Sequence, residues 1–207
     1  MTYKTEQELF WAGEFGTEYI QRNQGDWLLA SNLNFFSKAM HGASGVKNCI
    51  EFGANIGMNT KALRLLYPHW EQFGIEINTN AARQLATVIP PDHVFNSSIL
   101  DFNMDAQWDL VLIKGVLIHI NPDMLPLVYD KLVAASGKYL LVAEYYNPEP
   151  VTINYRGHKD RLFKRDFAGE VMDRHPEMQL VDYGFAYRGD PNYPQDDITW
   201  FLMERRS

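Results

Sequence analysis

Short apolar runs alternate with segments of helical spacing through most of the chain, and this alternation predicts the fold. Apolar strands are expected at residues 48–52, 72–77, 93–96, 108–113 and 138–145. Helices are expected between them at 59–67, 80–88 and 125–134. Because parallel strands need a crossover on one face of the sheet, this order predicts an α/β fold with a doubly wound, Rossmann-like sheet.

The N-terminal segment departs from this alternation and predicts two helices. Thr5 and Glu8 form a capping-box pattern at the start of the first helix. Asp26 is placed to cap the second helix, which ends near Gly42. We therefore expect residues 1–44 to form a helical cap on the sheet.

The C-terminal segment predicts the edge of the sheet. A helix is expected around residues 167–174, followed by strand-like runs at 179–187 and 198–204 with only a loop between them. Two strands without a helix between them pair antiparallel. The expected fold is therefore a single domain over 1–207, in which a core at 45–207 holds seven strands, mostly parallel with an antiparallel final strand.

Composition narrows the class of protein. The 207 residues are 46% hydrophobic, which is enough for one sizeable core, and the formal net charge of −7 opposes general nucleic-acid binding. A single cysteine, Cys49, excludes an intrachain disulfide and a cysteine-rich metal site, and we expect no metal. No apolar run approaches the roughly 20 residues that span a bilayer. We expect a cytoplasmic protein without a membrane partner.

The segment after the first strand carries the most specific signal. Glu51 ends an apolar run, and glycines at positions 53 and 57 allow a left-handed turn that brings the backbone close to a ligand. In an open α/β sheet, cofactors bind at this carboxyl end of the strands. Glu76 follows the second strand 25 residues after Glu51, near the spacing at which an acid binds ribose hydroxyls. Asp101 offers a further acid after the third strand.

The spacing of the glycines also distinguishes between nucleoside cofactors. The dinucleotide pattern Gly-x-Gly-x-x-Gly and the phosphate-binding Gly-Lys-Ser/Thr are both absent. An acid two residues before Gly53 repels pyrophosphate and suits a ligand that carries an ammonium and a sulfonium. S-adenosylmethionine fits best, and a Rossmann-type nucleotide-sugar dehydrogenase is a weaker alternative.

These motifs resemble those of the class I S-adenosylmethionine-dependent methyltransferases. The resemblance rests on Glu51-x-Gly53-x-x-x-Gly57, Glu76, Asp101 and Trp108-Asp109-Leu110-Val111. Three further segments look like the methylases associated with pseudaminic acid biosynthesis: Trp11-Ala12-Gly13-Glu14-Phe15-Gly16-x-x-Tyr19-x-x-Arg22-Asn23, Leu117-Ile118-His119-Ile120-Asn121-Pro122 and Tyr155-Arg156-Gly157.

The resemblance implies a role for each matching residue. Glu51 and the loop of Gly53, Asn55 and Gly57 would hold the methionine end of the cofactor, and Glu76 would hold the ribose. Asp101 would contact the adenine, with Ile77 and Leu100 on either side of the base, and Lys114 is grouped with these cofactor residues. S-adenosyl-L-homocysteine would be the product.

Residues at the ends of later strands are candidates for the acceptor side. His119 is the best candidate for a general base, with a buried core histidine as the alternative. Tyr145 and Tyr146 follow each other at a strand end, so alternation points only one of them into the cleft. We take Tyr145 as a catalytic candidate, and Tyr146 and Tyr19 as substrate-binding candidates.

The segment 155–165 differs in charge from the rest of the acidic chain. It carries five basic residues and one acid, a net charge of +4, and is expected to be a substrate loop. Tyr155, Arg156, Arg161 and Lys164 are therefore candidates for binding a small anionic acceptor. The alternative is a solvated basic loop that pairs with the acidic bulk of the protein.

These observations predict a methyltransferase that acts on a small anionic metabolite, such as an acidic sugar of the pseudaminic acid type or its precursor. The alternative is a non-catalytic partner or regulatory protein that kept the nucleoside pocket. The oligomeric state stays open.

Overall fold

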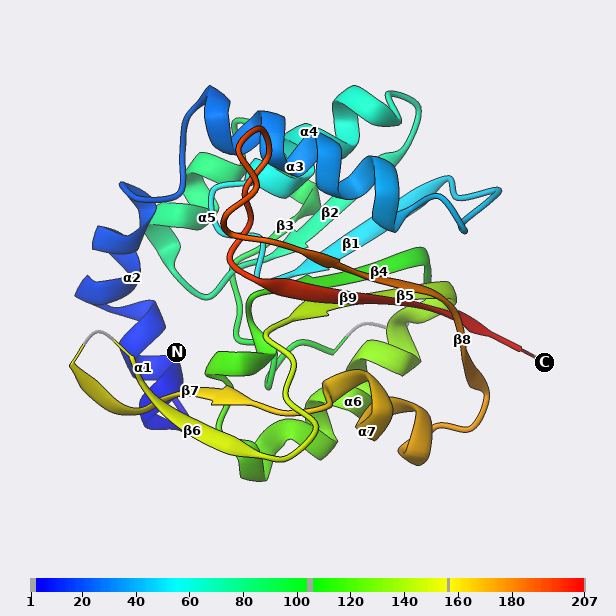
Figure 1. Ribbon diagram of the computed structural model, residues 1–207. Coiled ribbons are helices and arrows are strands. Elements are labelled where there is room, and N and C mark those ends of the chain that lie inside the picture. Colours follow the sequence, from blue (N-terminus) through cyan, green and yellow to red (C-terminus); the bar gives the residue numbers. More distant parts are fainter. Residues whose placement is uncertain (1–2, 104–105, 156, 207) are drawn as a thin grey trace.

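The computed structural model describes residues 3–103, 106–155 and 157–206, without the side chains of residues 158–160. Figure 1 shows its elements in chain order. The α-helices are α1 (Glu6–Ala12), α2 (Glu14–Ile20), α3 (Asp26–Ala39), α4 (Met58–Leu66), α5 (Thr79–Leu85), α6 (Leu125–Ala135) and α7 (Phe167–Arg174). The strands are β1 (Asn48–Phe52), β2 (Glu71–Ile75), β3 (Val94–Phe95), β4 (Trp108–Lys114), β5 (Ser136–Glu144), β6 (Val151–Tyr155), β7 (His158–Lys164), β8 (Met178–Ala186) and β9 (Ile198–Arg205).

The strand order confirms the predicted doubly wound sheet. Seven strands pair in the order β3-β2-β1-β4-β5-β9-β8, and the first five of them run parallel. Strand β9 pairs antiparallel with both β5 and β8, as expected for two strands without a helix between them. The order reverses next to β1, so the carboxyl ends of β1 and β4 flank the switch point of the sheet.

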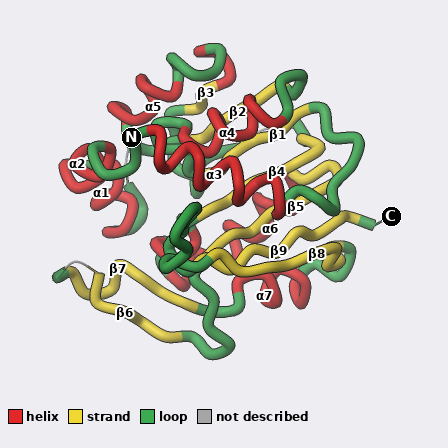
Figure 2. Tube along the Cα trace, turned by 45° about the horizontal axis from the view of Figure 1, so that its top comes forward, coloured by secondary structure: helices red, strands yellow, loops and turns green. Residues whose placement is uncertain are grey.

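Helices cover both faces of the sheet (Figures 1 and 2). Alternation along β1 divides its side chains: Cys49 packs on the face of α3 and α4, whereas Ile50 and Phe52 pack with α6 and α7. Both clusters contain buried apolar side chains of the central strands, and this burial on both faces of the sheet explains the nearly continuous apolar runs in the strand sequences. None of the described helices is long and apolar enough to cross a membrane.

The N-terminal segment forms three helices where the sequence predicts two. Gly13 adopts an extended conformation (φ −89°, ψ −152°) and separates α1 from α2. The capping box of Thr5 and Glu8 at the start of α1 is confirmed. The predicted capping role of Asp26 is wrong, because Asp26 lies inside the first turn of α3 and Gly25, with a φ of 106°, occupies the cap position.

The expected substrate loop at 155–165 is instead part of a β-hairpin. Strands β6 and β7 pair antiparallel as a separate two-stranded sheet, and Gly157 has a φ of 85° between Tyr155 and His158. The alternation of Val151, Ile153 and Tyr155 with polar residues is the strand signal that accounts for β6. The hairpin lies beside α1 and α2 in Figure 1, and Tyr155 contacts Phe15 of α2 with ring centroids 6.2 Å apart.

Candidate functional site

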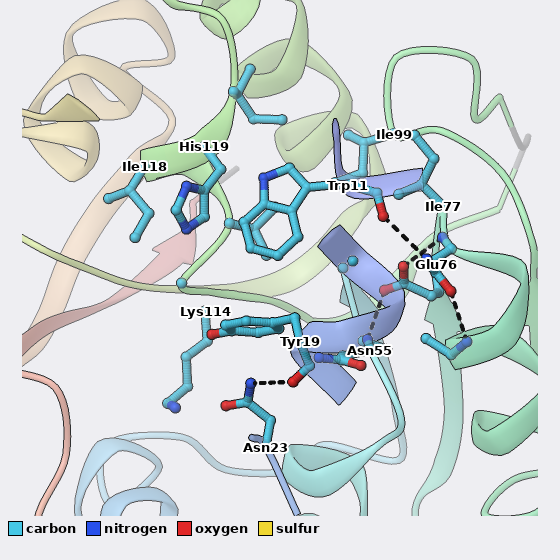
Figure 3. Close-up of a pocket in the computed structure, with 18 of the residues that line it drawn as sticks. Trp11, Tyr19, Asn23, Asn55, Glu76, Ile77, Ile99, Lys114, Ile118 and His119 are labelled. Carbon is cyan, nitrogen blue, oxygen red and sulfur yellow. Dashed lines mark hydrogen bonds between the residues drawn. The ribbon is translucent and has the colours of Figure 1, made fainter. Parts of the chain in front are cut away.

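A cavity of about 490 Å³ lies at the carboxyl ends of the parallel strands. Such a volume falls within the range of roughly 300–1,000 Å³ of small-molecule sites. Residues that follow β1, β2 and β4 line one side, including Asn55, Ile77 and Gly115. Side chains of the N-terminal helices line the other side, among them Trp11 and Tyr19, which are labelled in Figure 3. The cavity is therefore bounded by two parts of the chain that are far apart in sequence.

The turn after β1 is held in a left-handed conformation. Gly53, Asn55 and Gly57 have φ angles of 81°, 48° and 83°. Asparagine is one of the few residues other than glycine that adopts this region readily, which explains how position 55 functions without glycine. A Cβ atom on Gly53 would lie 2.5 Å from Cγ2 of Val116. Glycine at position 53 is required by both its φ angle and its close neighbour.

Glu76 lies next to this turn and holds its backbone in place. One carboxylate oxygen accepts a hydrogen bond from the Asn55 amide at 2.8 Å, and the other accepts one from the Asn78 amide at 2.7 Å (Figure 3). Burial raises the pKa of Glu76, and these amide donors oppose the rise. Each carboxylate oxygen can accept a second hydrogen bond, so Glu76 remains able to bind hydroxyl groups of a ligand.

Glu51 is buried behind the cavity instead of lining it. Its oxygens accept hydrogen bonds from Asn59 Nδ2 at 2.6 Å and from Thr60 Oγ1 at 3.2 Å, which attaches the end of β1 to the first turn of α4. Burial raises the pKa of Glu51 to about 7, and the hydrogen bonds and Lys114 oppose this rise. Gly57 also does not line the cavity, although its neighbours Ile56 and Met58 do.

The segment after β3 forms the far wall of the cavity. Ser98 and Leu100 of this segment line the cavity, as does Ile77 after β2; Ile77 and Leu100 are the two residues expected on either side of the base. Asp101 does not line it, and its carboxylate pairs with Lys4 Nζ at 2.5 Å. Ser98 also donates to Glu8, the acid of the capping box. The capping box therefore anchors α1 to this wall.

His119 lines the cavity and is held in one tautomer. Its Nδ1 lies 2.6 Å from the backbone oxygen of Arg161, and because a carbonyl only accepts, Nδ1 carries the proton. The imidazole packs between Trp11 and Tyr155, with ring centroids 4.6 and 5.0 Å away. Burial lowers the pKa of His119 to about 4. The ring is therefore neutral at pH 7, and Nε2 carries a lone pair.

The tyrosines expected around the acceptor separate as strand alternation predicts. Tyr145 lines the cavity together with Tyr19 and Tyr155, whereas Tyr146 does not line it and packs against Phe201 with ring centroids 6.0 Å apart. Burial raises the pKa of Tyr145 above its ordinary value. Its phenol group is therefore protonated at neutral pH and donates hydrogen bonds.

The cationic side chains of the segment 155–165 that the structure describes contact the protein itself. Arg161 pairs with Glu6 at 3.0 Å, and Lys164 Nζ lies 5.1 Å from the ring centroid of Tyr145. Arg165 pairs with Glu170 at 2.6 Å. Arg156 lies outside the described residues. Arg161 and Lys164 do not line the cavity, and the pair of Arg161 with Glu6 agrees with the part of the alternative in which this segment pairs with acids of the protein.

Several residues of the site were not predicted from the sequence. Trp11, Arg22 and Asp196 line the cavity. Trp11 and Arg22 belong to the N-terminal motif on which the resemblance rests in part, and Asp196 lies in the loop before β9. Glu144 ends β5, and its Oε1 accepts from the amides of Val116 and Leu117 at 2.9 and 2.8 Å. A buried acid at the end of an apolar strand is the signal that identifies Glu144.

Nε1 of Trp11 and Oδ1 of Asn55 belong to residues that line the cavity; both atoms are buried, and neither has a hydrogen-bond partner among the described residues. A buried polar group without a partner costs about 1–3 kcal/mol. Both atoms lie beneath the accessible surface, so neither faces a ligand in the cavity as the side chains stand.

No protein-family model matches the chain, and no curated protein matches its sequence. Solved structures match its fold. A 1,6-didemethyltoxoflavin-N1-methyltransferase of Burkholderia thailandensis, solved with S-adenosylhomocysteine, is 13% identical, with a TM-score of 0.74 over 100% of this chain and 92% of that chain. The N-methyltransferase NodS of Bradyrhizobium japonicum is 14% identical, with a TM-score of 0.64 over 91% of this chain and 98% of that one.

A third structure gives the same result. Magnesium protoporphyrin IX methyltransferase of Synechocystis, solved with S-adenosylmethionine bound, is 10% identical over the full length of both chains, with a TM-score of 0.64. The chain has the Rossmann-like fold of the S-adenosylmethionine-dependent methyltransferases.

Proposed function

We propose that this protein is a class I S-adenosylmethionine-dependent methyltransferase that acts on a small anionic metabolite. One observation carries the proposal: Glu76 lies beside the left-handed turn of Gly53 and Asn55, in a cavity at the switch point of the sheet. The structures with this fold that were solved with S-adenosylmethionine or S-adenosylhomocysteine also support it.

The residues of the cavity divide into two ends. Glu76 accepts hydrogen bonds from ribose hydroxyls, and Ile77 and Leu100 supply apolar contacts to the base. When bound, S-adenosylmethionine supplies an electrophilic methyl group. At the other end, Trp11 and Tyr155 restrict the volume around His119 and thereby orient the acceptor.

His119 binds the acceptor through its free nitrogen. Its Nδ1 donates a hydrogen bond to the Arg161 carbonyl, so Nε2 accepts a hydrogen bond from a hydroxyl or amino group of the acceptor. The low pKa of His119 makes it a weak proton acceptor in the absence of ligand, and orientation of the acceptor is its main contribution.

We propose an acidic sugar of the pseudaminic acid type, or its precursor, as the acceptor. The resemblance of the N-terminal motif to the methylases associated with pseudaminic acid biosynthesis supports this choice. Two cations, Arg22 and Lys114, are among the described residues that line the cavity, and they provide for an anionic ligand.

Isothermal titration with S-adenosylhomocysteine tests the cofactor. Glu76→Gln is expected to weaken binding about 10- to 100-fold, because hydrogen bonds to a charged group contribute about 1.5–3 kcal/mol. Glu71→Gln, which alters the exposed acid at the other end of β2, is the matched control and should bind like the wild type. If S-adenosylhomocysteine at high micromolar concentration does not bind the wild type, the proposal is refuted.

Incubation of a cell extract with methyl-labelled cofactor tests the acceptor. Mass spectrometry should show the label on an acidic sugar or its precursor. A labelled neutral or cationic metabolite would contradict the anionic acceptor while supporting the methyltransferase. Cofactor binding without any labelled product would favour the non-catalytic alternative.

A further inference from the structure

Lys114 is a cation inside the cavity. It is the last residue of β4, lines the cavity, and is only partly exposed. Its Nζ lies 5.3 Å from the ring centroid of Phe35 on α3, and Figure 3 shows the side chain running away from Glu76 toward Asn23. The ammonium is therefore separated from the end of the cavity that carries the nucleoside residues.

The ammonium of Lys114 has neither a hydrogen bond nor an ion pair with any described residue. Burial lowers the pKa of Lys114, and the charges of Glu51, Asp196 and Glu144 oppose this change, although none of these three acids forms an ion pair with the ammonium. Glu51 accepts from Asn59 and Thr60, and Glu144 accepts from two backbone amides. Because the ammonium borders the cavity and no described acid forms an ion pair with it, an anionic group of a ligand can bind it there.

The surroundings of Lys114 define the charge of this anion. A single ammonium offers one positive charge, and the three nearby acids oppose a phosphate or pyrophosphate, which carries more negative charge. Arg22 lines the same cavity, and its guanidinium carbon lies 5.8 Å from the ring centroid of Phe15. A monovalent carboxylate matches this environment.

We propose that Lys114 is the carboxylate-binding group of the cavity. The inference rests on the proposed function, which supplies two possible sources of the carboxylate: the amino-acid end of the cofactor and the acidic acceptor. Either source fits a cation at the end of β4, because β4 adjoins β1, where the turn of Gly53 begins, and β5, where Tyr145 lines the acceptor end.

Binding measurements on the purified full-length protein test the cofactor source. S-adenosylhomocysteine is compared by calorimetry with its decarboxylated analogue, which keeps the amine and the thioether. If Lys114 holds the cofactor carboxylate, the wild type prefers S-adenosylhomocysteine about 10- to 100-fold, as a charge-assisted hydrogen bond predicts, and Lys114→Met loses this preference. Lys114→Arg keeps the charge and should retain most of it.

A second pair of probes tests the acceptor source. N-acetylneuraminic acid, a carboxylated nine-carbon sugar, is compared with its methyl ester in the presence of S-adenosylhomocysteine. If Lys114 holds the acceptor carboxylate, the wild type binds the acid about 10- to 100-fold better than the ester, and Lys114→Met removes this difference while cofactor binding is unchanged.

Controls separate this inference from the proposed function. Lys47→Met, which neutralises an exposed lysine away from the cavity, should behave like the wild type in both comparisons. Lys114→Gln replaces Lys114→Met if the latter fails to fold. 5′-Methylthioadenosine has no amino-acid end and should bind the wild type and Lys114→Met equally.

If the wild type binds none of the nucleosides, the proposed function fails. If it binds them and Lys114→Met behaves like the wild type in both comparisons, the role of Lys114 is overturned.

Discussion

The close approach of Gly53 to Val116 allows a quantitative test of the turn that shapes the cavity. We consider the substitution Gly53→Ala. The added Cβ would lie 2.5 Å from Cγ2 of Val116 and 3.2 Å from its Cγ1, whereas carbon atoms in favourable contact are about 3.5–4.0 Å apart. The φ angle of 81° is in addition a conformation that alanine adopts only with strain.

Two contributions determine the expected loss of stability. The left-handed conformation costs about 1–2 kcal/mol for a residue with a Cβ. Overpacking against Val116 adds about 1–3 kcal/mol, because the side chain or the backbone must shift. Gly53→Ala should therefore lower the free energy of unfolding by about 2–5 kcal/mol, a large part of the roughly 5–15 kcal/mol that is typical of a folded protein.

Urea unfolding of a matched set of variants separates the two contributions. Gly157→Ala introduces the same strain at a φ of 85°, with no atom of a described residue within 4 Å of the new Cβ, and should cost only the conformational part. In a Val116→Ala background, the cost of Gly53→Ala should fall to the same value, since the overlapping methyl groups are gone. Equal costs for Gly53→Ala and Gly157→Ala in the wild-type background would refute the steric argument.

Two further predictions concern the walls of the cavity. Burial lowers the pKa of His119 from 6.5 to about 4, so the unfolded chain binds the proton first and the wild type loses stability as the pH falls from 6.5 to 4, by up to about 3 kcal/mol. His119→Gln should lack this loss, and parallel stability profiles of the two proteins in urea unfolding across this range would contradict it. Asn78 caps α5 through Oδ1 and donates through Nδ2 to carbonyls of α1 and Gly13, at 3.2–3.3 Å. Asn78→Asp keeps the cap but cannot donate, so limited proteolysis should cut residues 6–20 faster than in the wild type; equal cleavage rates would show that this amide does not hold the helices.

The parts of the site that were predictable from the sequence lie at strand ends. Glu76 and Leu100 line the cavity because the hydrophobic period fixes the strands, and parallel strands bring their carboxyl ends to one edge. The choice between Tyr145 and Tyr146 needs the register of β5, which the sequence leaves open by one residue. Asp101 shows the limit of this reasoning, since its carboxylate pairs with Lys4, which is 97 positions earlier in the chain.

The segments that enclose the cavity were less predictable because they dock through tertiary contacts and not through a repeating pattern. The tautomer of His119 depends on the backbone oxygen of Arg161 in β7, and the hairpin that carries this oxygen has no partner in the main sheet. Trp11 reaches His119 only because Asn78 and Glu8 attach α1 to the ends of β2 and β3. A strand end can be read from local periodicity, whereas these contacts require the packed fold. If the proposed function is correct, the cofactor end of the site therefore follows from the sheet, and the acceptor is selected by helices and a hairpin that can differ in sequence without changing the sheet.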